Sequence, residues 1–137
     1  MKAGRILLVD DEYDIQEIVA EILEDAGFRV IVAKNGREAL ERLEEDPVDL
    51  IVLDIMMPIM SGPEMVRELR KRHDARRIPP ILMISAGTEG RAIARELGCN
   101  FLVKPFDVDE ILEETRRLIG PSGATSGDDG GEVEKDA

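Results

Sequence analysis

The sequence contains a single cysteine, Cys99, and only 18 basic residues against 30 acidic ones. One cysteine excludes an internal disulfide framework and suits a reducing cytoplasm, so we expect a cytoplasmic protein. No apolar run approaches the length that crosses a membrane, and the N-terminal stretch MKAGRILLVDDE turns acidic too soon for a signal peptide. The net charge of −12 argues against direct nucleic-acid binding and favours basic partners or cations.

The C-terminal segment has almost nothing to bury. Residues 121–137, PSGATSGDDGGEVEKDA, hold five acids and one base, a net charge of −4 that leaves −8 for residues 1–120. A segment made of glycine, serine and acid cannot offset the entropy of folding, which predicts disorder. The full chain of 137 residues has the length of a single domain. We therefore expect a domain over residues 1–120 and a disordered acidic tail over residues 121–137.

Short apolar runs alternate with amphipathic stretches through the rest of the chain. Helical spacing follows each run, with Gly27 after the first helix, Pro63 at the start of the third, and Gly98 after a short fourth helix around residues 92–97. Continuous apolar strands alternating with helices predict an α/β fold, a five-stranded parallel sheet with helices on both faces. The five expected strands are Ile6–Val9, Val30–Ala33, Leu50–Leu53, Ile81–Ile84 and Phe101–Val103.

Polar residues follow four of the five strands, at the edge where parallel sheets bind ligands. Carboxylates that converge there repel one another unless one takes a proton or a cation fills the gap. Oxygen ligands suit Mg²⁺, and a carboxylate beside Mg²⁺ and an ammonium is a good nucleophile for phosphoryl transfer. The residues that follow the strands are Asp10, Asp11 and Glu12, then Asp54, then Ser85, and finally Lys104 and Pro105.

Four stretches, ILLVDDE, LIVLDIMMPIMSG, ILMISA and FLVKPF, stand in this order along the chain. Together they resemble the receiver domain of two-component response regulators, across residues 4–120. The resemblance implies a flavodoxin-like fold with strand order 2-1-3-4-5, as in stand-alone chemotaxis receivers. It also implies a signalling domain rather than an enzyme. Such a domain catalyses only its own phosphorylation and dephosphorylation. The phosphodonor would be a histidine kinase or a histidine phosphotransfer protein.

The resemblance assigns the acidic residues position by position. Asp54 matches the phosphoacceptor. Asp10 and Asp11 match the acid pair that holds Mg²⁺, together with Asp54 and the backbone carbonyl of Met56. Taken without the resemblance, Asp10 and Asp11 also suit the acid-rich start of a helix, where the helix dipole favours negative charge.

The resemblance also assigns the remaining polar positions. Ser85 matches the switch hydroxyl that closes on the phosphoryl group, and Lys104 matches the lysine that pairs with that group. Phe101 matches the switch aromatic, but it lacks the hydroxyl of the commoner tyrosine. Pro105 matches a proline that the family usually holds in cis. Ser85 and Lys104 stand 19 residues apart, fewer than is usual, so the region of the fourth helix departs from the family pattern.

Three functions remain open on these residues. A phosphorylation switch would act on an unknown downstream protein, with no nucleic-acid or membrane partner, and the resemblance also allows a homodimer through the fourth and fifth helices. A hydrolase of the haloacid-dehalogenase type also forms an aspartyl-phosphate, but it needs an aspartate where this chain has Met56. A binding module that works without phosphorylation would be favoured by an incomplete site. The sequence does not say whether the receiver stands alone or belongs to a longer protein.

Overall fold

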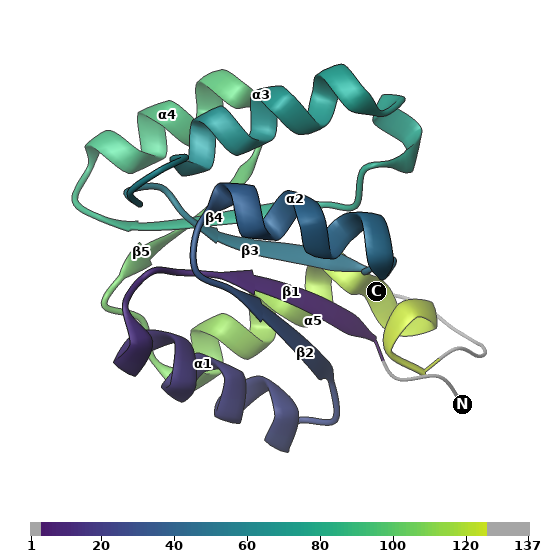
Figure 1. Ribbon diagram of the computed structural model, residues 1–137. Coiled ribbons are helices and arrows are strands. Elements are labelled where there is room, and N and C mark those ends of the chain that lie inside the picture. Colours follow the sequence, from purple (N-terminus) through teal and green to yellow (C-terminus); the bar gives the residue numbers. More distant parts are fainter. Residues whose placement is uncertain (1–3, 126–137) are drawn as a thin grey trace.

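Each of the five predicted apolar runs forms a strand of one parallel sheet (Figure 1). The computed structural model describes the backbone of residues 4–125 and the side chains of residues 4–120. The strand order is β2-β1-β3-β4-β5, so the predicted fold and order are confirmed. The strands are β1 (Arg5–Val9), β2 (Arg29–Ala33), β3 (Leu50–Asp54), β4 (Ile81–Ala86) and β5 (Asn100–Lys104).

A helix follows each strand. The helices are α1 (Tyr13–Asp25), α2 (Gly36–Glu45), α3 (Gly62–Arg72), α4 (Glu89–Leu97) and α5 (Val108–Thr125), with a 3₁₀ turn, η1 (Ala75–Arg77), before β4. Helix α4 begins at Glu89, three residues before the predicted start at Ala92. The apolar pattern missed this first turn because the sequence from Glu89 to Arg91 has no apolar side chain that would mark a helix. In the described part of the chain, no helix has the length and apolar composition of a membrane span.

Helix α5 is interrupted at Gly120, which has a φ of 82° and a ψ of 161°, and a second short helical segment runs from there to Thr125. The first five residues of the predicted tail are therefore helical. Residues 126–137 lie outside the described residues, so the disorder expected of them stays a prediction.

The sheet separates two apolar cores. Successive side chains of a strand point to opposite faces, so Leu7 and Ile51 face one core while Ile6 and Leu50 face the other. Helices α2, α3 and α4 cover the first face, and α1 and α5 cover the second (Figure 1). All five residues of β3 are buried because this strand lies at the centre of the sheet.

The start of α3 is specified by its own sequence. Ser61 accepts a hydrogen bond from the backbone N–H of Glu64, and the Glu64 carboxylate accepts one from the backbone N–H of Ser61. Pro63 stands in the first turn, as predicted, where its missing N–H costs nothing. The capped first turn of α3 fixes one end of the loop that begins after Asp54, and so helps to hold the end of β3 in place.

Thr115, on α5, is fully buried, and its hydroxyl has no hydrogen-bond partner among the described residues. We expect Thr115→Val to raise the free energy of unfolding by about 1 kcal/mol, because an unpaired buried hydroxyl costs roughly 1–3 kcal/mol. Urea unfolding followed by circular dichroism measures the change. Thr88→Val, at an exposed position, is the matched control. A loss of stability in Thr115→Val would show that the hydroxyl is paired after all.

Candidate functional site

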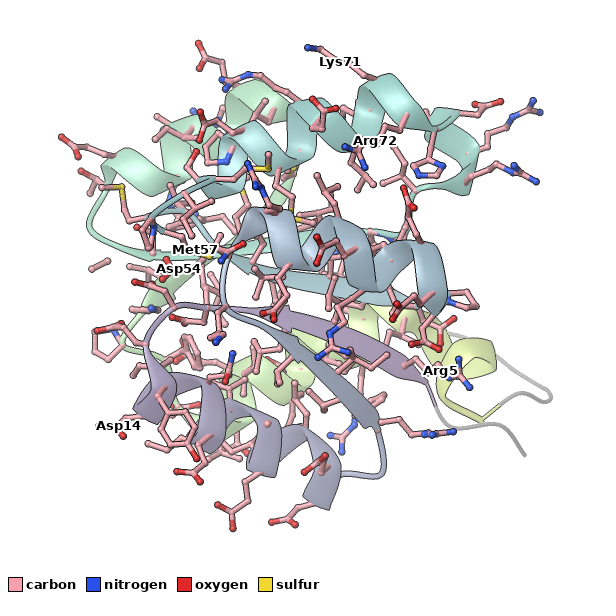
Figure 2. The ribbon with its side chains drawn as sticks, viewed as in Figure 1. Arg5, Asp14, Asp54, Met57, Lys71 and Arg72 are labelled. Atoms are coloured by element: carbon pink, nitrogen blue, oxygen red, sulfur yellow. The ribbon has the colours of Figure 1, made fainter. Side chains whose placement is uncertain are left out.

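Strands β1 and β3 bring two buried aspartates together. Val9 pairs with Leu53 in register, so Asp10, which follows Val9, and Asp54, which ends β3, stand at the same edge of the sheet. Asp10 is fully buried and Asp54 is 5% exposed. Figure 2 shows Asp54 at the opposite end of the sheet from Arg5, with Asp14 of α1 toward the Asp54 end. The site therefore lies at the carboxyl edge that the strand pattern predicts.

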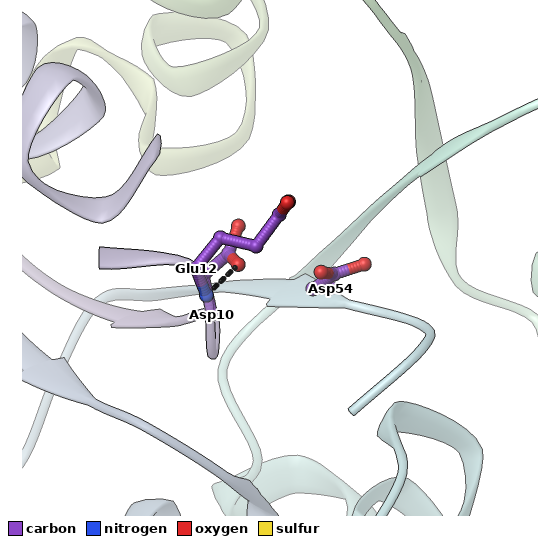
Figure 3. Close-up of side chains that lie close together, drawn as sticks. All are labelled: Asp10, Glu12 and Asp54. Carbon is purple, nitrogen blue, oxygen red and sulfur yellow. Dashed lines mark hydrogen bonds between the residues drawn. The ribbon is translucent and has the colours of Figure 1, made fainter. Parts of the chain in front are cut away.

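Glu12 joins these two aspartates. One carboxylate oxygen each from Asp10, Glu12 and Asp54 lies within 4.8 Å of the others (Figure 3). The Glu12 backbone N–H donates to Asp10 Oδ1 at 2.9 Å, and the Met56 backbone N–H donates to Asp54 Oδ1 at 3.3 Å. Asp11, predicted as a ligand, is exposed and lies outside this trio. The predicted roles of Asp11 and of the Met56 carbonyl remain predictions.

Sequence reasoning noted Glu12 at the strand end but assigned it no role. Glu12 is the residue that precedes α1, where the chain turns from β1 into the helix. Because the chain turns there, the Glu12 side chain points toward the carboxylate of Asp10, two positions earlier. That spacing is the signal that could have identified Glu12.

Lys104 supplies the positive charge of the site. Its Nζ lies 3.5 Å from Asp10 Oδ2, 3.5 Å from Asp54 Oδ2 and 3.7 Å from Glu12 Oε1. The peptide bond from Lys104 to Pro105 is cis, as the resemblance implies. The lysine thus comes from the edge strand β5 and reaches the carboxylates that end β1 and β3.

Burial raises the pKa of Asp54 from its ordinary value of 3.8 to about 6. The Lys104 ammonium and the Met56 N–H oppose this rise, while the negative charges of Asp10 and Asp11 add to it. Burial lowers the pKa of Lys104, but the charges of Asp54 and Asp10 outweigh it, so this pKa lies above the ordinary 10.5. At neutral pH Lys104 is charged and most of the Asp54 carboxyl groups are ionised.

Two glycine contacts shape the site. A Cβ at Gly62 would lie 2.6 Å from the backbone oxygen of Asp54, so only glycine lets α3 begin this close to β3. A Cβ at Gly90 would lie 2.8 Å from the Phe101 ring and 2.9 Å from Ser85 Cβ. Glycine therefore lets the first turn of α4 contact both predicted switch residues.

Ser85 follows Ile84, which pairs with Asp54 in register, whereas Phe101 packs against the core under α4. Ser85 is 8% exposed, and its hydroxyl donates to the backbone oxygen of Ala86 at 3.2 Å. Phe101 pairs with Met83 across β4 and β5, and the Arg91 guanidinium stands 5.2 Å from the centre of its ring. A cation over an aromatic face is attracted by the ring quadrupole, so Arg91 favours this position of the ring.

The loop from β3 to α3 is strained at Ile59. This residue has a φ of 69°, a left-handed conformation that a β-branched side chain rarely adopts. The Met60 N–H donates to the Pro58 carbonyl at 2.7 Å, which closes a three-residue turn around Ile59. The strain costs on the order of 1 kcal/mol. The Ile59 side chain is exposed, so no packing in the core offsets this cost.

The donor set fits a hard divalent cation. All three neighbouring groups offer carboxylate oxygens, no sulfur or imidazole is among them, and a cation would relieve the repulsion between Asp10 and Asp54. Lys104 relieves part of this repulsion but carries only one positive charge. The same arrangement places a nucleophilic carboxylate beside an ammonium, which is what a phosphoryl acceptor needs.

The raised pKa of Asp54 predicts a pH-dependent stability. The folded state binds this proton more tightly than the unfolded chain does, so ionising Asp54 reduces stability as the pH rises from about 4 to about 6. Asp54→Asn removes that loss. We expect its stability advantage over the wild type to grow across this pH range and to stay constant above it.

Urea unfolding in metal-free buffer at a series of pH values measures this advantage. Asp14→Asn, at an exposed position near the same edge, controls for the change from acid to amide. An advantage for Asp54→Asn that does not vary between pH 4 and pH 7 would contradict a raised pKa.

Comparisons with known proteins agree with this geometry. Residues 6–116 match the family described as the response regulator receiver domain. The chain is 38% identical over 118 residues to the transcriptional regulatory protein CpxR of Escherichia coli K12, and 36% identical over 116 residues to response regulator RR06 of Streptococcus pneumoniae. These matches cover 85% and 83% of this chain, but 49% and 52% of the relatives, so the chain spans about half of their length.

Solved structures give the same result. The chemotaxis protein CheY4 of Vibrio cholerae superposes with a TM-score of 0.78 at 34% identity, covering 85% of this chain and 99% of that one. The receiver domain of a histidine kinase from Syntrophus aciditrophicus also has a TM-score of 0.78, at 31% identity, covering 92% and 96%. With its family match, its strand order and its acidic edge, this chain belongs to the receiver domains of two-component response regulators.

Proposed function

We propose that this receiver domain takes a phosphoryl group onto Asp54 from a phosphohistidine, with Mg²⁺ bound, and that the modification changes its surface. The observation that supports this most directly is the buried Asp54 carboxylate, which lies 3.5 Å from Lys104 and beside Asp10. The donor would be a histidine kinase or a histidine phosphotransfer protein. The single free cysteine suits a cytoplasmic location, which is part of the proposal.

Asp54 carries the chemistry. One of its carboxylate oxygens bonds to phosphorus, the bond from phosphorus to the histidine nitrogen breaks, and the imidazole leaves with that electron pair and takes a proton from solvent. Lys104 offsets negative charge on the transferred group. Mg²⁺ held by Asp10, Asp11, Asp54 and the Met56 carbonyl would neutralise phosphoryl oxygens. The domain thus promotes only its own phosphorylation and the hydrolysis that reverses it.

Ser85 and Phe101 would report the modification. The Ser85 hydroxyl now bonds to Ala86, and a phosphoryl oxygen on Asp54 offers it a charged and therefore stronger acceptor. A shift of Ser85 loosens its contact with Gly90, which also packs on the Phe101 ring. The equilibrium between two positions of Phe101 and α4 would then shift, and a downstream protein would read the result.

An apolar groove next to the site suits the phosphodonor. Its volume is about 570 Å³, and it lies between α1 and the segment that follows β5, bordering Lys104. Ile18 is 56% exposed and Val108 is 50% exposed, although the surface of this chain is rich in acid. Contiguous exposed apolar side chains mark protein contacts. A helical partner docked here would bring its phosphohistidine to Asp54.

Phosphorylation should require the Asp54 carboxylate. Wild-type protein incubated with acetyl phosphate and Mg²⁺ should gain the mass of one phosphoryl group, and Asp54→Asn should gain none, because an amide is not a nucleophile toward phosphorus. Intact-protein mass spectrometry measures the gain, and omission of Mg²⁺ should abolish it. Asp14→Asn keeps Asp54 and should be labelled like the wild type. Normal labelling of Asp54→Asn would refute the assignment.

A charge in the apolar groove should impair docking of the phosphodonor but not the chemistry at Asp54. Ile18→Asp places a charge in the groove without touching the carboxylates. It should slow phosphoryl transfer from a histidine phosphotransfer protein by about five- to thirtyfold, because loss of one well-packed contact costs about 1–2 kcal/mol.

Labelling of Ile18→Asp by acetyl phosphate should stay unchanged, because that donor needs no docking surface. Val32→Asp, an exposed position on the edge strand β2, is the control for the added charge. Equal slowing with both donors would mean that the substitution disturbs the site rather than the docking of a partner.

A further inference from the structure

Gln16 is a buried polar residue on the side of α1 that faces the sheet. It is 8% exposed and stands one turn before Val19, which is buried in the apolar core. Its side-chain Nε2 donates to two backbone carbonyls, that of Asp10 and that of Ala33, each at 3.2 Å. These carbonyls belong to the chain just after β1 and to the last residue of β2.

The two carbonyls differ in what else they bond. Ala33 also accepts the Asp10 backbone N–H at 3.1 Å. For the Asp10 carbonyl, Gln16 is the one donor found among the described residues. The Gln16 amide therefore fixes the plane of the peptide that joins Asp10 to Asp11.

We propose that Gln16 is a positioning residue for the cation site. The orientation of the peptide after Asp10 decides where Asp11 points and how the Asp10 carboxylate meets the backbone of Glu12. The proposal rests on the proposed function, since it concerns the same Mg²⁺ site. It adds a residue that touches none of the ligands' carboxylates and acts through the backbone.

The chemistry of the side chain supports this role. A primary amide carries two N–H groups on one nitrogen, enough for two carbonyls, whereas a carboxylate has none and a thioether has none. Apolar residues form the rest of the buried face of α1, so burying a polar group here is costly unless it is paired. Partners that orient ligands indirectly typically change metal affinity by 10–100-fold when they are removed.

The test compares two variants on one helix. Gln16→Met keeps the length of the side chain but removes both N–H donors. Val19→Ala, one turn later, opens a cavity in the core and lowers stability without removing a hydrogen bond. Calorimetric titration with Mg²⁺ alone gives the affinity, and hydrogen exchange at the Asp10 amide reports the strand end. Gln16→Leu serves in place of Gln16→Met if the latter does not fold.

Gln16→Met should weaken Mg²⁺ binding by about tenfold or more and speed exchange at the Asp10 amide. Val19→Ala should leave Mg²⁺ binding within about twofold of the wild type, because its effect is confined to packing. Equal Mg²⁺ affinity in wild type and Gln16→Met would overturn the proposal while leaving the proposed function intact. A wild-type protein that binds no Mg²⁺ would instead refute the proposed function, and this inference with it.

Discussion

The balance of charge between Asp10, Asp54 and Lys104 is the constraint on which the rest of the site depends. Parallel strands β1 and β3 place two carboxylates at one buried edge, where ionising both is costly because burial and mutual repulsion oppose it. Lys104, from the far edge of the sheet, lies 3.5 Å from both carboxylates and offsets part of that cost. The charge that Lys104 leaves unbalanced is the physical basis for the cation and the phosphoryl group that we propose at this site.

Between Ser85 and Lys104, helix α4 packs closely on both predicted switch residues. The helix begins four residues after Ser85, and Gly90 in its first turn packs against both Ser85 and Phe101. The Arg91 guanidinium lies over the Phe101 ring. Because phenylalanine has no hydroxyl, the ring is held by packing and by this cation rather than by a hydrogen bond. A shift at Ser85 would thus act on α4 directly, because Gly90 of this helix packs against Ser85.

Helix α1 serves the site on two sides. Its buried face carries Gln16, which holds the peptide after Asp10 through backbone carbonyls. Its exposed face carries Ile18, which borders the apolar groove beside Lys104. A partner in this groove would therefore contact the same helix that carries Gln16. In the proposed function, partner docking and cation binding would therefore share helix α1 as a common support.

The sequence by itself determined the strands and what stands at their ends. Apolar runs of strand length alternating with helical spacing predict the parallel sheet, and that sheet brings Asp10, Asp54 and Lys104 to one edge whatever the details of the loops. Tertiary structure decided that Glu12, rather than Asp11, completes the compact trio of carboxylates, and that Gln16 is buried. The position of Glu12 depends on the turn from β1 into α1, and the two backbone partners of Gln16 depend on how α1 packs against β1 and β2; the pattern of apolar residues specifies neither.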